Sequence, residues 1–447
     1  MSTRLVVVGG VAAGMSAASK ARRTDPDMEI VVYEKNGYVS YGACGLPYFI
    51  QGLISHPTDL IARTPEQFAK QKIQVLVHNE VTQIDPVGRR VTVRDLATGE
   101  TFDTPYDHLM VSTGGYAVRP PIAGLDLLPD NLFVVRSVED GIAIRHFIEA
   151  QQPRTAVIVG AGYIGLEMCE ALVAGHGLEV TILTLLEPLL PTIDKDMVEH
   201  VSAELDQHSV ALHVQSVRAI ECQNGRAVAA HTDDATFPAD LFILAAGVRP
   251  NTGLAQATGI ALGPTGAIKV DDHQRTNVEN IYSGGDVAEA LDLVTGKSTY
   301  VPLGTTANKQ GRVAGENIAG GNAAFAGIVG TAVVKVFDLD VARTGLTEAQ
   351  AQDQGYDVRT TVIKCGSVAH YMPGGGPLHV KLVYEANGRL LGAQMVGSAA
   401  AKRIDVVAAA LYGCWKIDDL RRLDLSYAPP FAPVWDALLI AANVAQV

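Results

Sequence analysis

The sequence has little of what marks a disulfide scaffold, a metal-binding ribbon or a membrane protein. Only five of its 447 residues are cysteine, and none forms a CxxC pair. Neither a disulfide framework nor a zinc ribbon is therefore predicted, and no metal site is expected. No window approaches the roughly 20 apolar residues that cross a bilayer. The apolar run from 5 to 15 holds three glycines and lacks a cleavage site, so we expect a cytoplasmic chain without a signal peptide.

Positive charge is also scarce. Lysine and arginine total 35 against 48 aspartate and glutamate, which gives a formal net charge of −13. A surface of this sign does not neutralise nucleic-acid phosphates or anionic lipids. The chain is 48% apolar, and its 44 glycines lie scattered among apolar runs. This composition indicates a globular α/β protein, and the length is enough for about three domains.

Two distant segments share one strand-turn-helix-strand pattern. The first has a buried strand at 4–8, a glycine turn at 9–14, a helix at 15–23 and a second strand at 29–33. Such βαβ units place a mononucleotide on the turn between the first strand and the helix.

The second copy has a strand at 155–159, a turn at 160–165, a helix at 166–173 and a strand at 179–183. From about residue 327 the pattern changes to antiparallel-type strands and a late helix without a glycine-rich phosphate turn. The expected elements there are strands at 332–337, 379–384 and 390–396 and a helix near 402–412.

The two glycine turns differ in how completely they match a dinucleotide-binding turn. Gly160, Gly162 and Gly165 occupy all three required positions: the sharp bend, the close approach to the pyrophosphate, and the packing of helix on strand. In the first turn the three positions are Gly9, Val11 and Gly14, so the middle glycine is missing. The neighbouring Gly10 must provide the conformational freedom that this glycine would have given. Two such turns in one chain predict two bound nucleotides.

The residues that end the second strand of each unit bear on which nucleotide binds. Glu34 lies 20 residues after Gly14, where a carboxylate accepts hydrogen bonds from the hydroxyls of an adenosine ribose. The corresponding place in the second copy is Thr184, followed by Leu185 and Leu186. Because this place has neither a carboxylate nor an arginine, the choice between NADH and NADPH stays open.

Four further segments carry a family resemblance. They are TNVENIYSGGDVA at 276–288, YDHLMVSTG at 106–114, LFILAAGVRPN at 241–251 and SYGACGLPYFI at 40–50. Together they resemble the pyridine nucleotide-disulfide oxidoreductases, flavoproteins in which NAD(P)H reduces FAD and FAD reduces a redox cysteine. The usual CxxxxC pair is absent, because Val39 and Phe49 stand at that spacing from Cys44. The chain therefore resembles the single-cysteine branch of the family.

The C-terminal portion favours one group within that branch. AHYMPG at 369–374, VGSAAAKRIDVV at 396–407 and SYAPPFAPVW at 426–435 resemble the coenzyme A-disulfide reductases, although the loop at 397–402 is shorter and less acidic. The resemblance implies that Tyr371 and Tyr427 of a partner subunit meet Cys44. Peroxidases and water-forming oxidases of the branch carry a histidine where this chain has Ala12.

The resemblance also implies an architecture. We expect an α/β fold with two Rossmann-like domains and a C-terminal α+β interface domain that completes each site in a homodimer. The expected parts are an FAD domain at 1–115 and 247–326, an NAD(P)H domain at 116–246, and the interface domain at 327–447.

The residues assigned to each role follow from the motif matches. Cys44, Tyr371 and Tyr427 are expected to be catalytic, with the thiolate of Cys44 favoured by a helix start and Tyr427 donating the proton. A basic helix and a later one are expected to bind coenzyme A through Arg22, Arg23, Asn308 and Arg312. The expected FAD and NAD(P)H contacts are Gly9, Gly10, Ala12, Ala13, Gly14, Glu34, Lys35, Ser40, Val81, Thr113, Gly114, Gly160, Gly162, Tyr163, Ile164, Gly165, Glu167, Gly247, Gly285, Asp286, Pro302 and Thr305.

Plainer interpretations stand beside these assignments. Cys169, Cys222, Cys365 and Cys414 are expected to be small core residues. The two tyrosines can serve interface packing alone, the basic helix can be a solvated face, and Glu167 can be an ordinary exposed glutamate. For the whole protein, coenzyme A disulfide reduction is favoured over persulfide or polysulfide reduction and over NADH oxidation. A redox-sensing flavoprotein that docks a protein partner is the non-enzyme alternative.

Overall fold

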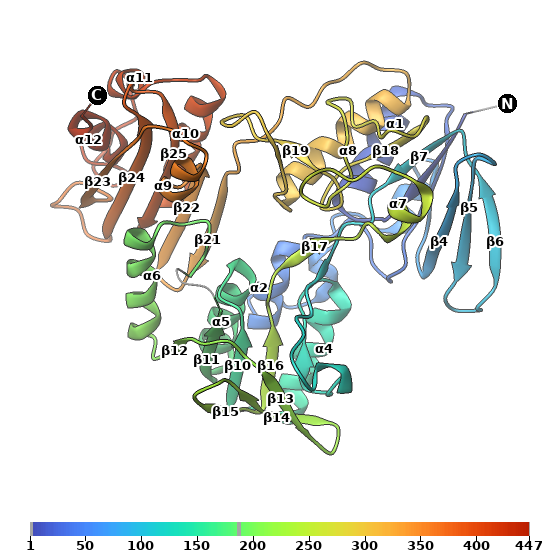
Figure 1. Ribbon diagram of the computed structural model, residues 1–447, viewed down its shortest axis with the longest axis horizontal. Helices are drawn as coiled ribbons and strands as arrows, with labels where there is room; N and C mark the ends of the chain where they lie inside the picture. Colours follow the sequence, from blue (N-terminus) through green and yellow to red (C-terminus); the bar gives the residue numbers. More distant parts are fainter. Residues whose placement is uncertain (1–2, 186–188, 447) are drawn as a thin grey trace.

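A computed structural model describes residues 3–185 and 189–446, and its ribbon forms three lobes (Figure 1). The first lobe is built on a parallel sheet with strand order β18-β7-β1-β2-β3. Its strands are β1 (Arg4–Val8), β2 (Glu29–Tyr33), β3 (Ile73–Leu76), β7 (His108–Val111) and β18 (Ile281–Ser283). β18 comes from a segment some 170 residues after β7, so two separated stretches of chain complete one sheet.

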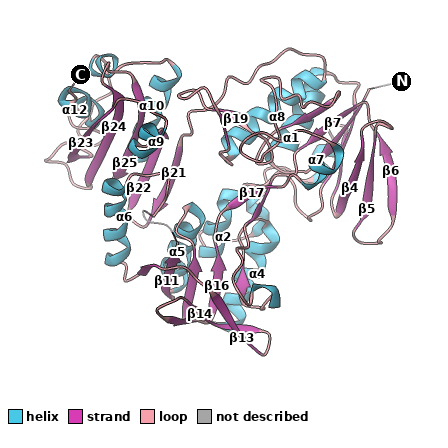
Figure 2. Ribbon diagram, in the orientation of Figure 1, coloured by secondary structure: helices cyan, strands magenta, loops and turns pink. Residues whose placement is uncertain are grey.

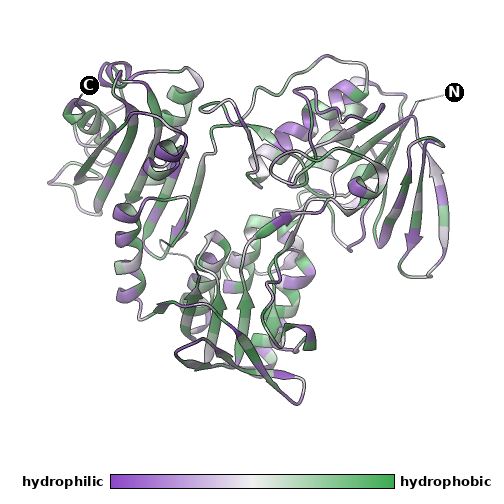
Figure 3. Cartoon of the chain, viewed as in Figure 1, coloured by the Kyte–Doolittle hydropathy of each residue, from purple (hydrophilic) through white to green (hydrophobic). Residues whose placement is uncertain are grey.

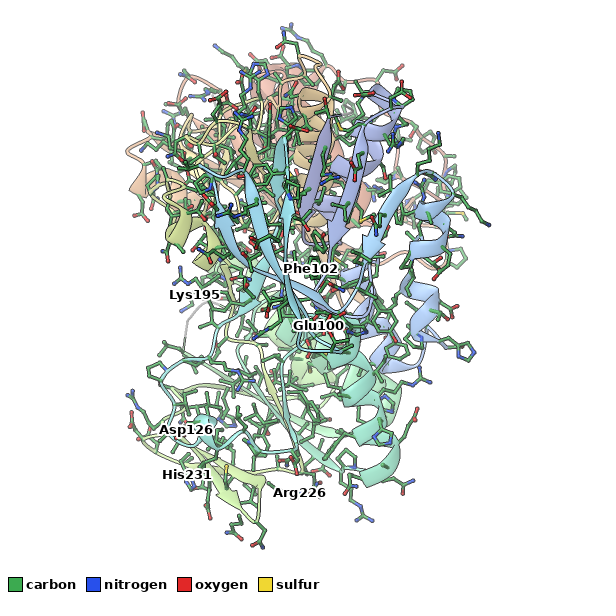
Figure 4. All side chains as sticks on the ribbon, turned by 90° about the vertical axis from the view of Figure 1, so that its right-hand side faces the viewer. Glu100, Phe102, Asp126, Lys195, Arg226 and His231 are labelled. Carbon is green, nitrogen blue, oxygen red and sulfur yellow. The ribbon has the colours of Figure 1, made fainter. Side chains whose placement is uncertain are left out.

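Helices α1 (Ala12–Thr24) and α8 (Gly304–Ile318) pack against each other beside this sheet. Their approach is close because Gly311 and Gly315 face the backbone of α1; an added Cβ would lie 2.2 Å from the Ala13 oxygen and 2.2 Å from the Ala17 oxygen. A small antiparallel sheet of β4 (Asn79–Asp85), β5 (Arg90–Asp95) and β6 (Thr101–Pro105) completes the lobe, with Phe102 labelled on it in Figure 4.

The second lobe repeats the parallel arrangement, with strand order β12-β11-β10-β16-β9. The strands are β9 (Leu132–Phe133), β10 (Thr155–Val159), β11 (Glu179–Thr184), β12 (Ala211–Val214) and β16 (Leu241–Leu244). Its helices are α4 (Val138–Gln151), α5 (Tyr163–His176) and α6 (Lys195–Gln207). A second sheet, β13 (Ala219–Gln223), β14 (Arg226–His231) and β15 (Thr236–Pro238), lies at the outer end, where Figure 4 labels Arg226 and His231.

The two crossings between these lobes run side by side. β8 (Gly115–Ala117) leaves the first lobe, β17 (Val248–Pro250) returns to it, and the two pair antiparallel with Val248 opposite Ala117. The second lobe is thus an insertion whose two ends meet.

The third lobe contains an antiparallel sheet with order β21-β22-β25-β24-β23. The strands are β21 (Ala332–Val336), β22 (Leu339–Gly345), β23 (Val358–Gly366), β24 (Pro377–Glu385) and β25 (Leu390–Gly397), and the helices are α9 (Glu348–Asp353), α10 (Ala400–Tyr412), α11 (Ile417–Arg421) and α12 (Ala437–Val444). Figure 2 shows the sheets of all three lobes as strands flanked by helices, and Figure 3 shows their apolar residues along those strands. The expected fold class is confirmed; β22 and β23 are strands that the sequence pattern did not predict.

Candidate functional site

The first glycine turn joins β1 to α1, and its glycines are required by close contacts. Gly9 has φ +98°, and a Cβ there would lie 2.2 Å from the Ser112 oxygen. A Cβ on Gly14 would lie 1.9 Å from the Gly9 oxygen, and one on Gly10 would lie 2.8 Å from a Val39 methyl. Gly10 therefore supplies the room that the missing middle glycine would have given, and the turn keeps its tight path.

Glu34 ends β2 directly beside this turn. Its buried carboxylate accepts hydrogen bonds from the backbone N–H of Gly10 (2.8 Å) and Asn36 (2.9 Å). Burial raises the pKa of Glu34, and the two backbone donors oppose that rise. A carboxylate has about four lone-pair directions, so these two bonds fix its orientation and leave acceptor capacity for a ribose.

The second turn, between β10 and α5, has the same tight geometry at its ends and open space at its middle. A Cβ on Gly160 would lie 2.3 Å from the Ala245 oxygen, and one on Gly165 would lie 2.1 Å from the Gly160 oxygen. Gly162 begins α5, and a Cβ there would meet no atom within 4 Å. This is the arrangement that admits a pyrophosphate against the N–H groups of the helix start.

The remaining assigned cofactor residues mostly border the same turns. Ser40 donates its N–H to the Gly10 oxygen (2.9 Å), and the Thr113 hydroxyl donates to the Asn251 oxygen (2.7 Å). Gly285 packs on α1, where a Cβ would lie 2.8 Å from the Ala13 Cβ. Val81 is a buried core side chain, so it can offer a ligand only its backbone. Lys35, Gly247 and Thr305 are exposed, whereas Ala12, Gly114, Tyr163, Ile164 and Pro302 are half-buried.

Cys44 is a free, exposed cysteine in the short turn Ala43–Gly45 that precedes α2 (Leu46–Gln51). We expected the helix start to favour the thiolate, and the structure corrects this. Partial burial raises the pKa of Cys44, the carboxylates of Glu167 and Asp286 raise it further, and Arg136 opposes them. In the chain by itself, burial and the two carboxylates therefore favour the protonated thiol.

Those three charged residues bring parts of the first and second lobes together around Cys44. Glu167 on α5 is half-buried rather than exposed, and burial, followed by the charge of Glu170, raises its pKa to about 7. The guanidinium of Arg136 lies 3.4 Å from an oxygen of Asp286 and donates to the Gly115 oxygen at 3.2 Å.

Arg136 is a functional candidate that sequence reasoning missed. Its Nε is buried and has no hydrogen-bond partner, which is costly for a charged donor unless a bound group accepts from it. The segment around it carries no glycine motif, so only the folded arrangement reveals its position. This unpartnered donor, together with the open space at Gly162 and Gly114, shows that the residues fit two bound dinucleotides.

Four residues on α1 and α8 were assigned to coenzyme A binding, and some of them already bond to other parts of the protein. Arg22 donates to the backbone oxygens of Pro26 and Lys72, among others, at 2.5 Å and 2.8 Å. These bonds hold the segment after α1, whereas Nε of Arg22 is buried without a partner, so the assignment of Arg22 to a phosphate stays a prediction. Arg23 and Arg312 are exposed, while Asn308 accepts from the Ser16 hydroxyl at 2.7 Å.

The structure brings Tyr371 and Tyr427 together on the third lobe. Their side chains are 61% and 46% exposed, and a hydrogen bond with Tyr371 raises the pKa of Tyr427. The His370 ring meets the Tyr371 ring edge-on at 5.1 Å between centroids. The two tyrosines thus form one hydroxyl pair on an open face of this chain.

The other four cysteines were expected to be core residues, and this holds fully for one of them. Cys169 is buried, Cys222 and Cys365 are partly buried, and Cys414 is exposed. Cys414 corrects our expectation, because it follows α10 in a turn with φ +52° rather than inside the lobe. All five cysteines are free.

A group of possible metal ligands, Glu204, His208 and Asp338, lies where α6 meets the third lobe, with ligand atoms within 4.8 Å of one another. Glu204 already accepts the backbone N–H of Asp338 at 2.8 Å. Hydrogen bonding between lobes therefore accounts for this group. Separately, none of the helices within residues 3–185 and 189–446 has the length and apolar character needed to span a bilayer.

The sequence matches models of one protein family in two parts of the chain. The family model for pyridine nucleotide-disulphide oxidoreductases matches residues 3–311, and that for the dimerisation domain of the same family matches residues 331–438.

Three similar proteins illustrate the range of names. The NAD(P)H coenzyme A polysulfide/persulfide reductase of Pyrococcus horikoshii is 40% identical over 447 residues, covering 99% of this chain and 98% of that protein. The coenzyme A disulfide reductase of Staphylococcus haemolyticus is 34% identical over 439 residues, with 96% of each chain covered. The solved structure of an NAD-dependent persulfide reductase from A. fulgidus has a TM-score of 0.95 and 39% identity, covering 99% of this chain and 83% of that one.

Proposed function

Because the chain belongs to the pyridine nucleotide-disulphide oxidoreductase family, we propose that it uses FAD and NAD(P)H to reduce coenzyme A disulfide through Cys44. One observation carries the proposal: Cys44 is free and exposed, and the residues five positions away on either side are the buried Val39 and Phe49. A thiol without a second thiol at that spacing must form its disulfide with the substrate.

The proposed division of labour follows the lobes. Residues 1–115 and 247–326 bind FAD, residues 116–246 bind NAD(P)H, and residues 327–447 form the contact between two subunits. The glycine turns of the first two lobes and the open tyrosine face of the third lobe support this assignment. The protein is accordingly a homodimer in which each third lobe serves the Cys44 of its partner.

The glycine turn of the first lobe and Glu34 would hold FAD, which would supply two-electron transfer from NAD(P)H to the cysteine. The thiolate of Cys44 attacks one sulfur of coenzyme A disulfide, a new S–S bond forms to Cys44, and the first coenzyme A leaves as a thiolate. Two electrons then break the Cys44–coenzyme A disulfide, which releases the second coenzyme A and restores the thiolate. Tyr427, hydrogen-bonded to Tyr371, gives a proton to the departing sulfur.

The outer surface of α1 and α8 binds the phosphate-bearing end of coenzyme A. Arg23 and Arg312 are exposed cations of these helices, and Asn308, on α8, accepts the Ser16 hydroxyl of α1. For the variant Arg23→Ala we expect a several-fold higher KM for coenzyme A disulfide and an unchanged KM for NADH, measured by steady-state kinetics, because charge-assisted hydrogen bonds to phosphate are lost. An unchanged KM for the disulfide would remove Arg23 from the proposed site.

Persulfide or polysulfide reduction is the second candidate. The names of the Pyrococcus horikoshii and A. fulgidus relatives favour it. Once two electrons have reduced the Cys44–coenzyme A disulfide, the Cys44 thiolate attacks the sulfane sulfur of a persulfide or polysulfide, an S–S bond forms to Cys44, and the remaining part of the acceptor leaves as a thiolate. The same residues therefore serve either acceptor.

The decisive experiment compares acceptors with the purified holoenzyme under anaerobic conditions. We expect the variant Cys44→Ser to keep NADH-driven flavin reduction, followed at 450 nm, and to lose turnover of coenzyme A disulfide and polysulfide. Cys414→Ser removes the other exposed cysteine and should behave like the wild type. Mass spectrometry of Cys44 should find coenzyme A attached. Retained disulfide turnover in Cys44→Ser would refute the proposal.

A further inference from the structure

Two loops of the third lobe carry the tyrosine pair. Tyr371 lies in the loop between β23 and β24, and Tyr427 lies in the segment between α11 and α12. One backbone hydrogen bond joins the loops, from the Ala369 N–H to the Pro429 oxygen at 3.1 Å. Both tyrosines are exposed, so neither is held by burial of its own ring.

Arg403, on α10, forms hydrogen bonds with both loops. Its guanidinium donates to the Ser367 oxygen at 2.9 Å on the first loop and to the Phe431 oxygen at 3.0 Å on the second. It also donates to the Ala399 oxygen at 2.9 Å, at the start of its own helix. One side chain thus spans the two loops four residues from each tyrosine.

The orientation of Arg403 is itself fixed by a largely buried ion pair. Its Nε lies 2.8 Å from an oxygen of Asp436, and the two side chains are only 12% and 10% exposed. The other oxygen of Asp436 accepts the Leu438 N–H at the start of α12. A planar fork with five donors in fixed directions can serve a carboxylate and three carbonyl groups together, whereas the single ammonium of lysine cannot.

We propose that Arg403 is a positioning residue that holds the two tyrosine loops in register and thereby sets the Tyr371–Tyr427 hydroxyl pair for proton donation. This inference rests on the proposed function of the tyrosines. It adds a largely buried residue that acts through protein contacts, and it explains why the two exposed hydroxyls are paired: their loops are both bonded to one side chain of α10.

The test variant is Arg403→Lys, which keeps the charge and removes the fork. The matched control is Arg421→Lys in the same lobe. Arg421 also pairs with a carboxylate, that of Asp418, and donates to the backbone oxygens of Ala442 and Ala445. It joins α11 to α12 and does not contact either tyrosine loop in the described hydrogen bonds.

Two measurements are made on the holoenzyme. The first places 3-fluorotyrosine at position 427 and follows its ionisation by ¹⁹F NMR. The second measures the rates of flavin reduction and of disulfide turnover separately. In Arg403→Lys we expect the position-427 titration to shift downward as far as it does in Tyr371→Phe. Disulfide turnover should fall about 10-fold, a fraction of the 10²–10⁴-fold typical for a lost general acid, while flavin reduction is unchanged.

A double-mutant comparison separates positioning from general support of the lobe. If Arg403 acts through Tyr427, then Arg403→Lys has little further effect on turnover in a Tyr427→Phe background. Arg421→Lys should leave both the titration and the turnover at wild-type values.

An unchanged titration in Arg403→Lys would overturn the inference, as would losses that multiply in the double variant. If the titration shifts while Tyr427→Phe turns over disulfide normally, the positioning role stands and the proposed proton donor is what fails.

Discussion

At the scale of single residues, burial and the neighbouring carboxylates both disfavour the thiolate of Cys44. Glu167 and Asp286 raise the pKa of the thiol after burial has done so. Glu167 has its own pKa raised to about 7 by burial and by Glu170. The carboxyl therefore changes charge near neutrality, in the range where the thiol must ionise to react.

The variant Glu167→Gln tests this coupling. Removing a negative charge favours the thiolate, so the pKa of Cys44 should fall and alkylation by iodoacetamide should begin at lower pH than in the wild type. The pH profile of alkylation in the reduced holoenzyme, read by mass spectrometry at Cys44, checks it. Glu66→Gln alters an exposed glutamate that is not among the charges acting on Cys44 and should leave the profile unchanged. A profile that stays in place in Glu167→Gln would show that the carboxyl does not act on the thiol.

Single residues also mark the limit of what the sequence predicts. The glycines and Glu34 were predictable because one motif fixes both residue type and spacing. Arg22 and Arg136 were not, because the task of an arginine depends on what lies at the end of a long side chain. Arg22 binds backbone oxygens near the end of its own helix, whereas Arg136 reaches Asp286, which is 150 residues away in the chain.

At the scale of elements, the parallel strands came close to their predicted bounds, since β-branched runs between polar residues define them well. The helices after the glycine turns begin three residues before the predicted starts, at Ala12 and Tyr163. The first turn of each of these helices lies within the glycine turn, where apolar periodicity alone does not detect a helix. Polar residues interrupt the apolar ones in both β22 and β23, such as Asp340 and Arg343 in β22 and Arg359 and Lys364 in β23, so these strands escaped the pattern.

The helix that follows Cys44 is held by the second lobe. Arg145 on α4 donates to the backbone oxygens of Ile54 and Ser55, each at 3.1 Å, and stacks over the Phe49 ring at 4.9 Å. Nε2 of His176, at the end of α5, donates to the Ile50 oxygen at 2.6 Å. These contacts dock the C-terminal end of α2 and the turn beyond it, so the domain assigned to NAD(P)H also supports the redox cysteine.

We therefore expect Arg145→Gln to slow disulfide turnover several-fold and to lower the thermal midpoint. Hydrogen bonds to charged groups contribute about 1.5–3 kcal/mol each at most, and the carbonyl groups of Phe49, Ile54 and Ser55 lose their partner. Arg226→Gln is the control, because Arg226 stacks on Phe147 of the same helix and contacts Gln151 rather than α2. Thermal melts and turnover rates of the two variants decide the matter; equal effects in both would contradict a specific role for Arg145.

At the scale of the whole molecule, buried charges join the second lobe to the third. The ammonium of Lys381 on β24 lies 2.9 Å from Asp196, 2.7 Å from Glu348 and 3.2 Å from Asp194, and its side chain is 3% exposed. Burial disfavours its charged form, yet the hydrogen bonds to Glu348 and Asp196 outweigh burial and raise the pKa of Lys381. Its contribution to stability is thus present below its ordinary pKa and fades as the pH rises through the raised value.

Lys381→Met should destabilise the protein toward the lower end of the roughly 3–5 kcal/mol that follows removal of one partner from a buried ion pair. The lower end applies because Asp196 and Glu348 are partly exposed. Thermal melts at pH 7.5 measure the loss. Lys402→Met removes an exposed ion pair with Asp405 and should leave the melt unchanged. A Lys381→Met variant with the same thermal midpoint as the wild type would contradict the prediction.

The proposed dimer makes a prediction about mixtures. Cys44→Ser and Tyr427→Phe subunits are each impaired alone, but a mixed dimer has one site with an intact cysteine and an intact partner tyrosine. After subunit exchange of an equal mixture, activity should rise to about a quarter of the wild-type value, since half of the dimers are mixed and each has one good site. If turnover stays at the level of the separate variants, the tyrosine does not act across the interface.

The paired crossing strands β8 and β17 make the second lobe a removable cassette. Its entry and exit lie opposite each other, with Val248 beside Ala117, so the lobe of a relative with another pyridine nucleotide preference can be grafted between these two points without a spacer. The graft must keep Arg145 and His176, because their side chains hold α2, the helix that follows Cys44, and the turn beyond it. Nucleotide preference can therefore be exchanged, with the sulfur chemistry kept, by replacing the one segment between these two points.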